Sequence, residues 1–319
     1  MRQHTVCRSD ILFEDDQGGL YMGVNINPDV AEYNAFGPWA YEITDTHPMP
    51  RLFTPFFTAD DGALLKIKIP REVERRNAAP GMDLYDYVIA LYEDSLLILK
   101  REGGQVKKFQ IASGDFRGVR IYENMLKGGY TVFAANGTVS FPFNAVSIDL
   151  FQKLTNLILE KLQGGNTAGR KYDTSSLPVT ETMPEAVLLE NMLHDVQMKL
   201  PGIRVGAVQK SVDVHHKGAT RDIIERMLWK EMNPEALHLY TDDLLVVLEN
   251  GVFPNRVGMQ EFGYTQTIIP LNCIDGVEVA ASADYSLLEE CILSMGTNKV
   301  TYHFDIDNEE VAAFYNALK

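Results

Sequence analysis

Cysteine is scarce in this 319-residue chain, with three residues at positions 7, 273 and 291. Thiols so few and so widely spaced form neither a disulfide framework nor a zinc-binding pattern. The sequence also lacks the run of about 18 uncharged apolar residues that a membrane-spanning helix needs. Its first residues, MRQHTVCRSDILFEDD, have no apolar core and turn acidic early, unlike a signal peptide. These features predict a cytoplasmic protein.

Sequence motifs of the common catalytic sites are missing as well. The stretch GGQVKK (103–108) has glycine and lysine without the spacing of a phosphate-binding loop. No glycine-rich dinucleotide pattern follows a predicted strand, and neither G-x-S-x-G nor H-E-x-x-H occurs. We therefore expect a protein that is not an enzyme and that binds no cofactor and no metal.

Positive charge is in short supply, since 29 basic residues face 44 acidic ones and the formal net charge is −15. Proteins that bind nucleic acids or anionic membranes in general are more often basic. The deficit is uneven, however: residues 61–163 carry a net +2, whereas residues 201–319 carry −9. We expect no nucleic-acid partner and, at most, a peripheral membrane contact.

A repeat is what the sequence does have. LYEDSLLIL (91–99) and LYTDDLLVV (239–247) share five of nine residues, and each reads as a tight hairpin around an aspartate-containing turn. IASGDFRGV (111–119) matches IPLNCIDGV (269–277). The offset between copies grows from 148 residues at the hairpin to 158 at the second block. Insertions confined to loops are what a duplicated fold tolerates.

The repeat ends with a strand and a helix in each copy. VSFPF (139–143) and VTYHF (300–304) alternate as half-buried strands do, and they lie 161 residues apart. Each is followed by an apolar stripe at helical spacing. The stripe residues are Phe151, Leu154 and Ile158 in the first copy and Val311, Phe314 and Leu318 in the second.

The remaining segments divide the chain into parts. Residues 1–60 form an N-terminal segment of open role, in which the aromatic residues of 33–57 could fill a core or line a groove. Residues 61–163 and 201–319 hold the two copies. Residues 164–200 begin as a Gly/Ser/Thr-rich linker and continue as an amphipathic helix. The spacing predicts a further helix over 220–234.

The order of these blocks resembles the bacterial pleckstrin-homology-like domain. In the second copy the resemblance is carried by LYTDDLLVVLENG, IIPLNCIDGVEV and VTYHFDIDNEEVAAFYNAL, and in the first, more loosely, by LYEDSLLILKREG, FRGVRI and VSFPF. The resemblance implies an α+β fold of two tandem β-rich domains, each a bent antiparallel sheet capped by a C-terminal helix. It also implies a binding or scaffolding role, because members of this family are usually not enzymes.

Two surfaces are candidates for binding. Lys100, Arg101, Lys107 and Lys108 bracket the first-copy hairpin and could hold an anionic lipid or phosphorylated ligand, although lysines also guard exposed strand edges. The second copy instead carries a longer segment, 251–266, which we expect to be a surface loop that contacts a protein. Its candidate contact residues are Phe253, Met259, Phe262 and Tyr264.

Other chemistry-bearing residues have plainer interpretations. His215 and His216 are neighbours on extended chain, so their side chains point to opposite faces and do not share a metal. Asp94 and the pair Asp242-Asp243 are expected to stabilise turns. Cys291 is expected to be a buried thiol. The sequence thus predicts a non-catalytic scaffold for a protein partner, with a homo-oligomer possible and an anion-binding role as the alternative.

Overall fold

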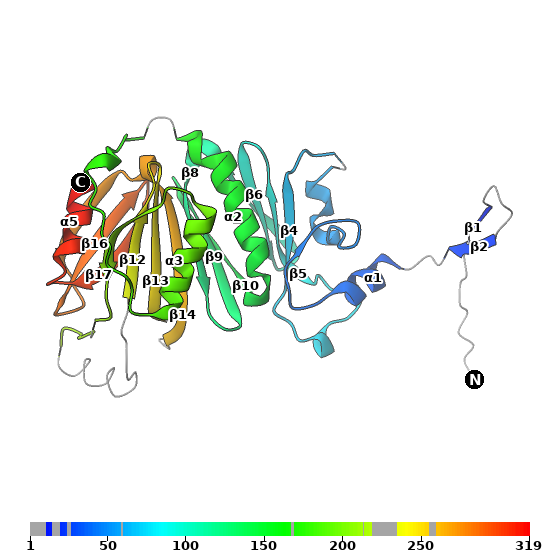
Figure 1. Ribbon diagram of the computed structural model, residues 1–319. Coiled ribbons are helices and arrows are strands. Elements are labelled where there is room, and N and C mark those ends of the chain that lie inside the picture. The colour runs from blue at the N-terminus through cyan, green and yellow to red at the C-terminus, as the bar shows by residue number, and fades with distance from the viewer. Residues whose placement is uncertain are drawn as a thin grey trace.

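The computed structural model describes residues 11–14, 20–23, 27–58, 60–166, 169–212, 214–218, 235–254 and 260–319. The protein is an α+β protein with antiparallel sheets of five, seven and three strands, and α5 is its C-terminal helix (Figure 1). A separate hairpin joins β1 (Ile11–Glu14) to β2 (Leu20–Gly23). The expected helix over 220–234 lies outside the described residues.

The predicted strands and closing helices are present in both copies, in the same order. In each, a group of four strands precedes a group of three strands and a helix. The first copy consists of β4 (Leu65–Pro70), β5 (Tyr85–Leu91), β6 (Ser95–Glu102), β7 (Gln105–Ala112), β8 (Phe116–Glu123), β9 (Lys127–Ala134), β10 (Gly137–Asn144) and α2 (Ile148–Leu162). The second consists of β11 (Arg204–Gln209), β12 (Glu235–Tyr240), β13 (Leu244–Pro254), β14 (Gln260–Pro270), β15 (Gly276–Ala281), β16 (Leu288–Met295), β17 (Asn298–Asp305) and α5 (Glu309–Ala317).

The repeated hairpins match with a slip of one residue from the sequence alignment. The closing backbone bond runs from Tyr92 N to Ser95 O in the first copy, and from Thr241 N to Leu244 O in the second. The structural offset is therefore 149 residues and not 148, so Leu91 corresponds to Tyr240 and not to Leu239. Because a slip of one residue moves every side chain to the other face of a strand, the distinction decides which residues face each core.

The two copies share one sheet. β8 of the first copy pairs antiparallel with β14 of the second, from Val119–Ile268 to Glu123–Tyr264. This pairing gives the seven-stranded order β10-β9-β8-β14-β13-β12-β11. The other four strands of the first copy join β3 (Tyr41–Glu42) in the five-stranded sheet, and β15–β17 form the three-stranded sheet.

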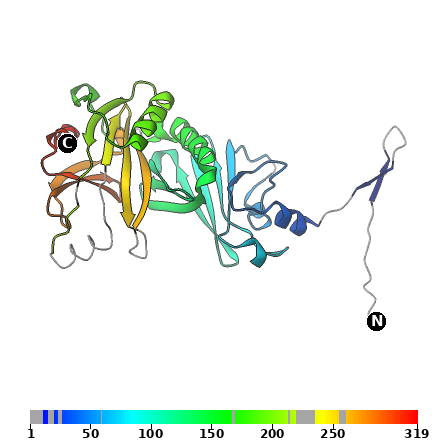
Figure 2. The ribbon, with the colours of Figure 1, turned by 60° about the horizontal axis from the view of Figure 1, so that its bottom comes forward.

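Helices α2 and α3 (Val187–Lys199) lie next to each other on one face of the seven-stranded sheet (Figures 1 and 2). The core beneath them contains Phe151, Leu154 and Ile158 of α2 together with Leu189 and Leu193 of α3. The opposite face of the second-copy strands packs against β15–β17 and α5, which bury Val311, Phe314 and Leu318 completely. The predicted helix stripes are therefore confirmed as core.

Residues 27–58 cover the outer face of the first-copy strands. They include α1 (Pro28–Ala35), and they bury Phe36 and Phe53 against Val88 and Leu99. Of the other aromatic residues in 33–57, Trp39 and Phe56 stay exposed. Most of these aromatics thus belong to a core. The buried Lys68 ammonium donates to the Pro48 carbonyl at 2.8 Å, which ties this cover to β4.

Helix α3 covers the equivalent outer face of the second copy, and its first turn is capped from another strand. The Glu235 carboxylate of β12 accepts hydrogen bonds from the backbone N–H of Glu185 and of Ala186, the latter at 3.0 Å. A carboxylate at a helix N-terminus satisfies donors that have no partner within the helix. Each copy therefore has its outer face covered by the segment that precedes its first strand.

Shortening one core side chain in each closing helix should lower the stability of the protein. Phe151→Ala and Phe314→Ala each remove a fully buried ring, so we expect each to lower the free energy of unfolding by about 3–5 kcal/mol. Chemical denaturation of each variant measures this loss. The matched control is Met125→Ala, because Met125 is 96% exposed and should change stability by less than about 0.5 kcal/mol. A loss below about 1 kcal/mol for either phenylalanine would contradict the packing.

Candidate functional site

A groove lies between α2 and α3, above the strands that join the two copies. It contains a hollow of about 70 Å³, several times the space that one buried water needs. Apolar side chains from both copies line it: Ile121, Leu159, Met192, Val196, Leu200 and Ile268. Polar side chains complete it: Gln152, Thr155, Asn156, Asp195, Lys199, Tyr264 and Gln266. We call this set of residues the α2–α3 groove.

The floor of the α2–α3 groove holds a hydrogen-bonded pair across the two copies. The Tyr264 hydroxyl of β14 donates to the Glu123 carboxylate of β8, and the two residues are directly opposite in the ladder. Burial raises the pKa of Glu123, the bond from Tyr264 opposes this rise, and the nearby Asp149 adds to it. Burial, the bond to Glu123 and the charge of Asp195 all raise the pKa of Tyr264. Tyr264 of the floor and the adjacent Glu123 thus form a half-buried carboxylate–phenol pair.

The rim of the α2–α3 groove is apolar at one end and is crossed by a side-chain hydrogen bond at the other. Leu188, Met192, Asp195 and Lys199 recur at helical spacing on α3, so they share one side of that helix. Leu188 is 41% exposed and leads to the half-buried Met192. At the other end, Lys199 Nζ donates to Gln152 Oε1 of α2 at 2.7 Å. An exposed apolar stripe that ends in amides and charges is a composition typical of protein contact surfaces.

The strand pairing under the groove is closely packed. A Cβ at Gly118, whose φ is +148°, would lie 2.6 Å from the Ile268 carbonyl oxygen. On the opposite face of the sheet, Arg120 Nε donates to Thr267 Oγ1 at 2.9 Å. At the end of the junction, Asn166 and Asn272 bond each other's backbone carbonyls through their side-chain amides, both at 2.9 Å. The copies are therefore joined by the backbone ladder, by the Arg120–Thr267 bond and by the Asn166–Asn272 bonds.

The four basic residues predicted to bind an anion do not converge. The β6–β7 register places Lys100 opposite Lys107 and Leu99 opposite Lys108, so Lys100 and Lys107 share one face of the sheet while Arg101 and Lys108 share the other. Arg101 is bound to Asp86 at 2.6 and 2.9 Å, and Lys100 pairs with Glu102 at 3.2 Å. The structure therefore brings these cations together in pairs and not as one cradle.

The described residues of the segment 251–266 are strands and not a loop, which corrects the sequence-based expectation. Residues 251–254 continue β13, and residues 260–266 begin β14, as one long hairpin. Of the predicted contact residues, Phe253 and Phe262 lie in these paired strands, and Met259 is outside the described residues. Tyr264 is on the floor of the α2–α3 groove. The sequence alone did not reveal this role, because it depends on pairing with β8.

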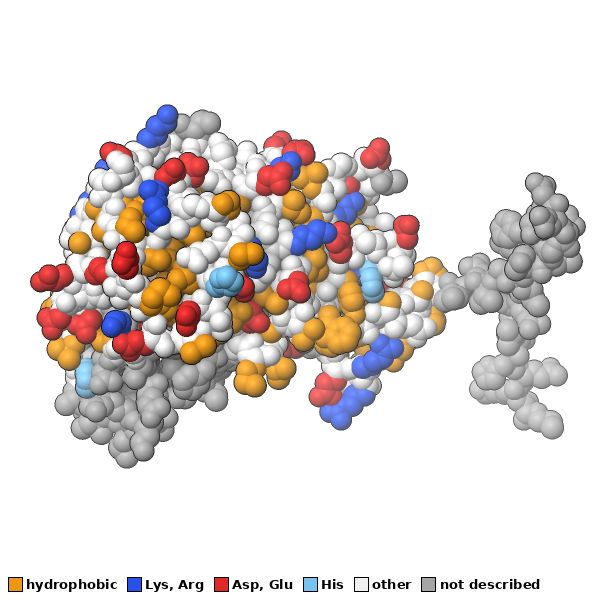
Figure 3. All heavy atoms as spheres, in the orientation of Figure 1, with side chains coloured by type: hydrophobic (Ala, Val, Ile, Leu, Met, Phe, Trp, Pro, Cys, Tyr) orange, Lys and Arg blue, Asp and Glu red, His pale blue; other side chains and the backbone are white. Residues whose placement is uncertain are grey.

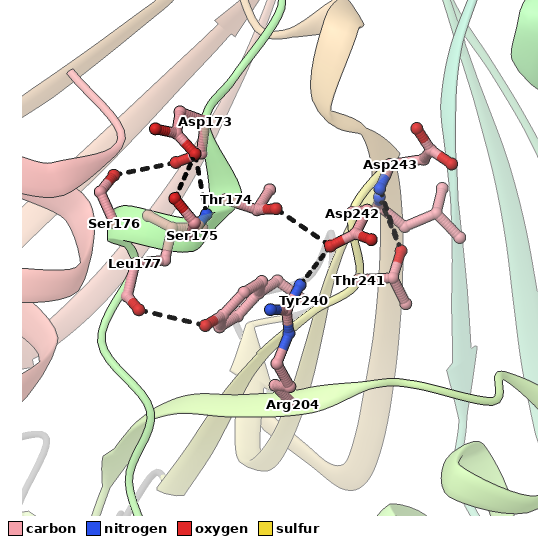
Figure 4. A network of polar contacts seen from close by, with 11 residues as sticks. Asp173, Thr174, Ser175, Ser176, Leu177, Arg204, Tyr240, Thr241, Asp242 and Asp243 are labelled. Atoms are coloured by element: carbon pink, nitrogen blue, oxygen red, sulfur yellow. Dashed lines mark hydrogen bonds and ion pairs between the residues drawn. The ribbon is translucent and has the colours of Figure 1, made fainter.

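Asp242 binds the linker between the copies (Figure 4). Its carboxylate accepts a hydrogen bond from Thr174 Oγ1 at 3.0 Å and pairs with the Arg204 guanidinium, which lies 4.6 Å from the centre of the Tyr240 ring. The turn itself is stabilised by Thr241 Oγ1, which accepts from the backbone N–H of Asp243 and Leu244. The expected turn-stabilising role therefore belongs to the threonine, while Asp242 fixes the linker on the second copy.

A second group of buried polar side chains lies inside the second copy. His238 Nδ1 is 2.7 Å from the Tyr315 hydroxyl, and burial lowers the pKa of His238 to about 3. Its Nε2 and the Tyr302 hydroxyl have no hydrogen bond of ordinary geometry to any residue that the structure describes. Burial raises the pKa of Glu249, and the charge of Arg120 opposes this effect. Burial therefore favours the neutral form of both His238 and Glu249 in the folded protein.

The other chemistry-bearing residues of the described chain do not form a metal site. Groups of three His, Cys, Asp or Glu residues placed to hold a metal do not occur in the described part of the chain. The bridge between His216 and Tyr285 places His216 against β15–β17, as a buried residue. Cys291 is a buried free thiol, as expected, and burial raises its pKa. Within the described ranges, no helix is both long enough and apolar enough to span a bilayer.

Comparison with known proteins adds no family. No protein-family model matches the chain, and no curated protein matches it.

The junction between copies should be sensitive to a single methyl group. Gly118→Ala would push a Cβ into the Ile268 carbonyl at a positive φ, so we expect a loss of about 2–3 kcal/mol in the free energy of unfolding. Thermal or chemical denaturation measures it. Gly104→Ala is the control, since nothing lies within 4 Å of its Cβ. Equal stability of the two variants would contradict the close packing.

Protonation of His238 should destabilise the fold in acid. The folded protein keeps this side chain neutral to about pH 3, whereas the unfolded chain takes up the proton near pH 6.5. Between these pH values the unfolded state binds more protons, so stability falls as pH falls. From pH 7 to pH 5 the expected loss from His238 is about 2 kcal/mol.

Denaturation of wild type and His238→Gln at both pH values tests this assignment. The variant should lose less stability on acidification than wild type does. The control is His194→Gln, an exposed histidine of α3, which should keep the pH dependence of wild type. An unchanged pH dependence in His238→Gln would exclude His238 as the titrating group.

Proposed function

We propose that the chain consists of two tandem pleckstrin-homology-like domains. What supports this is the order of elements: four strands, then three strands, then a closing helix whose apolar face is buried, in both copies. The corner between the fourth and fifth strands also repeats. Ser113 N donates to Asp94 O in the first copy, and Leu271 N donates to Asp243 O in the second, both at 2.8 Å.

We infer that the protein is a non-catalytic scaffold that binds a protein partner through the α2–α3 groove. The observation that carries this proposal is the groove itself: a hollow of mixed apolar and polar lining, formed by both copies and α3, with Leu188 and Met192 leading into it. Figure 3 shows hydrophobic side chains gathered on this face around α3. The partner would insert an apolar side chain between the helices and bond the amides of the rim.

The alternative, an anionic ligand on the basic hairpin, has less support. Two of its four cations are already paired with carboxylates, and the four are divided between two faces of the sheet. A phosphorylated headgroup needs several donors that converge on one point. We therefore place the partner in the groove and keep the hairpin as the rival site in the experiment.

A photo-crosslinking amino acid at Asn156 tests the proposal in the source cell. Asn156 is exposed on α2 at the groove, so it should capture one specific protein. The same amino acid at Ala313, which is exposed on α5, should not capture that protein. The captured partner is then purified, and its affinity for wild type and variants is measured by calorimetry.

Two matched methionine variants give the quantitative readout. Met192→Glu places a carboxylate in the hollow and should weaken binding at least about tenfold. Met198→Glu makes the same change at a residue of α3 that does not line the groove and is 75% exposed, and it should leave affinity unchanged. Equal affinities of these two variants would reject the groove. A loss caused instead by Lys107→Glu with Lys108→Glu would assign the partner to the hairpin.

A further inference from the structure

The copies are joined by the edges of two strands, and the equivalent strands of the other copy, β7 and β15, lie at sheet ends. β7 ends the five-stranded sheet and β15 ends the three-stranded sheet. Among the described residues, no backbone hydrogen bond extends from the outer edge of either strand. β7 is largely exposed, including Lys107 and Lys108, and β15 is half-buried with Glu278 exposed. An open strand edge can pair with a strand of another molecule, so we ask which strand would pair with β7 and with β15.

The in-chain junction shows how such edges pair. β14 is the fourth strand of the second copy, and β8 is the fifth strand of the first copy. Their counterparts are β7, the fourth strand of the first copy, and β15, the fifth strand of the second. The junction therefore uses one fourth strand and one fifth strand, and it leaves the other pair unused.

We propose that a second copy of this chain adds β7 to β15, repeating the β14–β8 junction between molecules. The register follows from the repeat, because Leu96 pairs with Ile111 just as Leu245 pairs with Ile269, which sets the fourth-strand offset at 158. Val119 pairs with Val132 as Val277 pairs with Leu293, which sets the same offset for the fifth strand.

The register predicts specific contacts. Where Thr267 pairs with Arg120 within the chain, Phe109 of one molecule would pair with Glu278 of the next. Where Thr265 pairs with Tyr122, Lys107 would pair with Ala280. Lys107 lies on the same face as Phe109, with its ammonium 5.0 Å from the ring centre. It is therefore diagonal to Glu278 of the neighbouring molecule, within reach of an ion pair.

Charge favours this partner over a random strand. β7 carries two exposed lysines, and the second copy, which supplies β15, belongs to the segment with net charge −9. Lysines on an edge oppose indiscriminate pairing but accept an edge that carries a carboxylate. At the in-chain junction the fifth strand carries the cation Arg120, whereas β15 carries Glu278 at the equivalent position. The fifth strand thus offers a carboxylate in the second copy, which suits the lysines of β7.

The two open edges cannot meet within one molecule. The five-stranded sheet and the three-stranded sheet lie at opposite ends of the long axis (Figure 1). The contact is thus heterologous, with different surfaces on the two partners, and it generates a ring or an open chain of molecules. The predicted assembly is weak and salt-sensitive, because it rests on a few backbone bonds and a surface ion pair.

Sedimentation velocity of the purified full chain, from about 5 to about 200 µM at low salt, tests the assembly. Wild type should associate as concentration rises. Lys107→Glu or Glu278→Lys alone should weaken association about five- to tenfold, and the double variant should restore it. Lys171→Glu is the control for charge, because Lys171 is exposed in the linker, and it should associate like wild type. Melting temperatures check that each variant is folded.

Disulfide trapping tests the register in a Cys7→Ser background. A mixture of Lys107→Cys and Ala280→Cys chains should give mixed covalent dimers on mild oxidation, because these positions face each other. Lys107→Cys mixed with Ala281→Cys should not, because neighbouring residues point to opposite faces.

Three results would overturn the proposal: a monomeric wild type at every concentration, a double variant no better than the single variants, or equal trapping at Ala280 and Ala281. The proposal does not rest on the α2–α3 groove. Met192→Glu should leave the assembly unchanged, so failure here and failure of partner binding are distinguishable.

Discussion

The antiparallel pairing of β8 with β14 is the contact on which the rest of the structure depends. It turns strands from two copies into one seven-stranded sheet, and so gives α2 and α3 a common face to pack on. The groove between these helices exists only because the sheet beneath them is continuous. The same pairing uses one fourth strand and one fifth strand, which leaves β7 and β15 as edges.

Local elements could be predicted from the sequence because their signals are local. The strands at 139–143 and 300–304 and the helix stripes around Phe151 and Phe314 follow from alternation and helical spacing, and all are present. The hairpin register could not be read in the same way. Identity aligned Leu91 with Leu239, but the residue that faces its own closing helix is Tyr240, 5.8 Å from the Phe314 ring. Short apolar stretches can match in sequence while presenting opposite faces.

The site was largely beyond the sequence because it is made by contacts between distant segments. Tyr264 and Glu123 are 141 residues apart in the sequence, and the β8–β14 ladder places them opposite each other so that their side chains bond. The basic residues near the first hairpin look like one cluster in sequence, yet strand alternation divides them between two faces. The segment 251–266 looks like an inserted loop because its apolar residues have no repeat in the first copy. Its described residues instead extend β13 and β14, and β14 places Tyr264 beside the first copy.

The copies differ most where each meets its surroundings, and this follows from their positions in the chain. Each outer face is covered by the preceding segment, residues 27–58 in one case and α3 in the other. Helix α3 covers the second-copy strands and also lies beside α2, and the groove is between these two helices. Residues 27–58 cover only the first-copy sheet. Within the described residues, the junction is where a cover helix lies beside a closing helix, and this arrangement gives the α2–α3 groove. Function located at the junction would require both copies, which gives a physical reason for a chain to keep two.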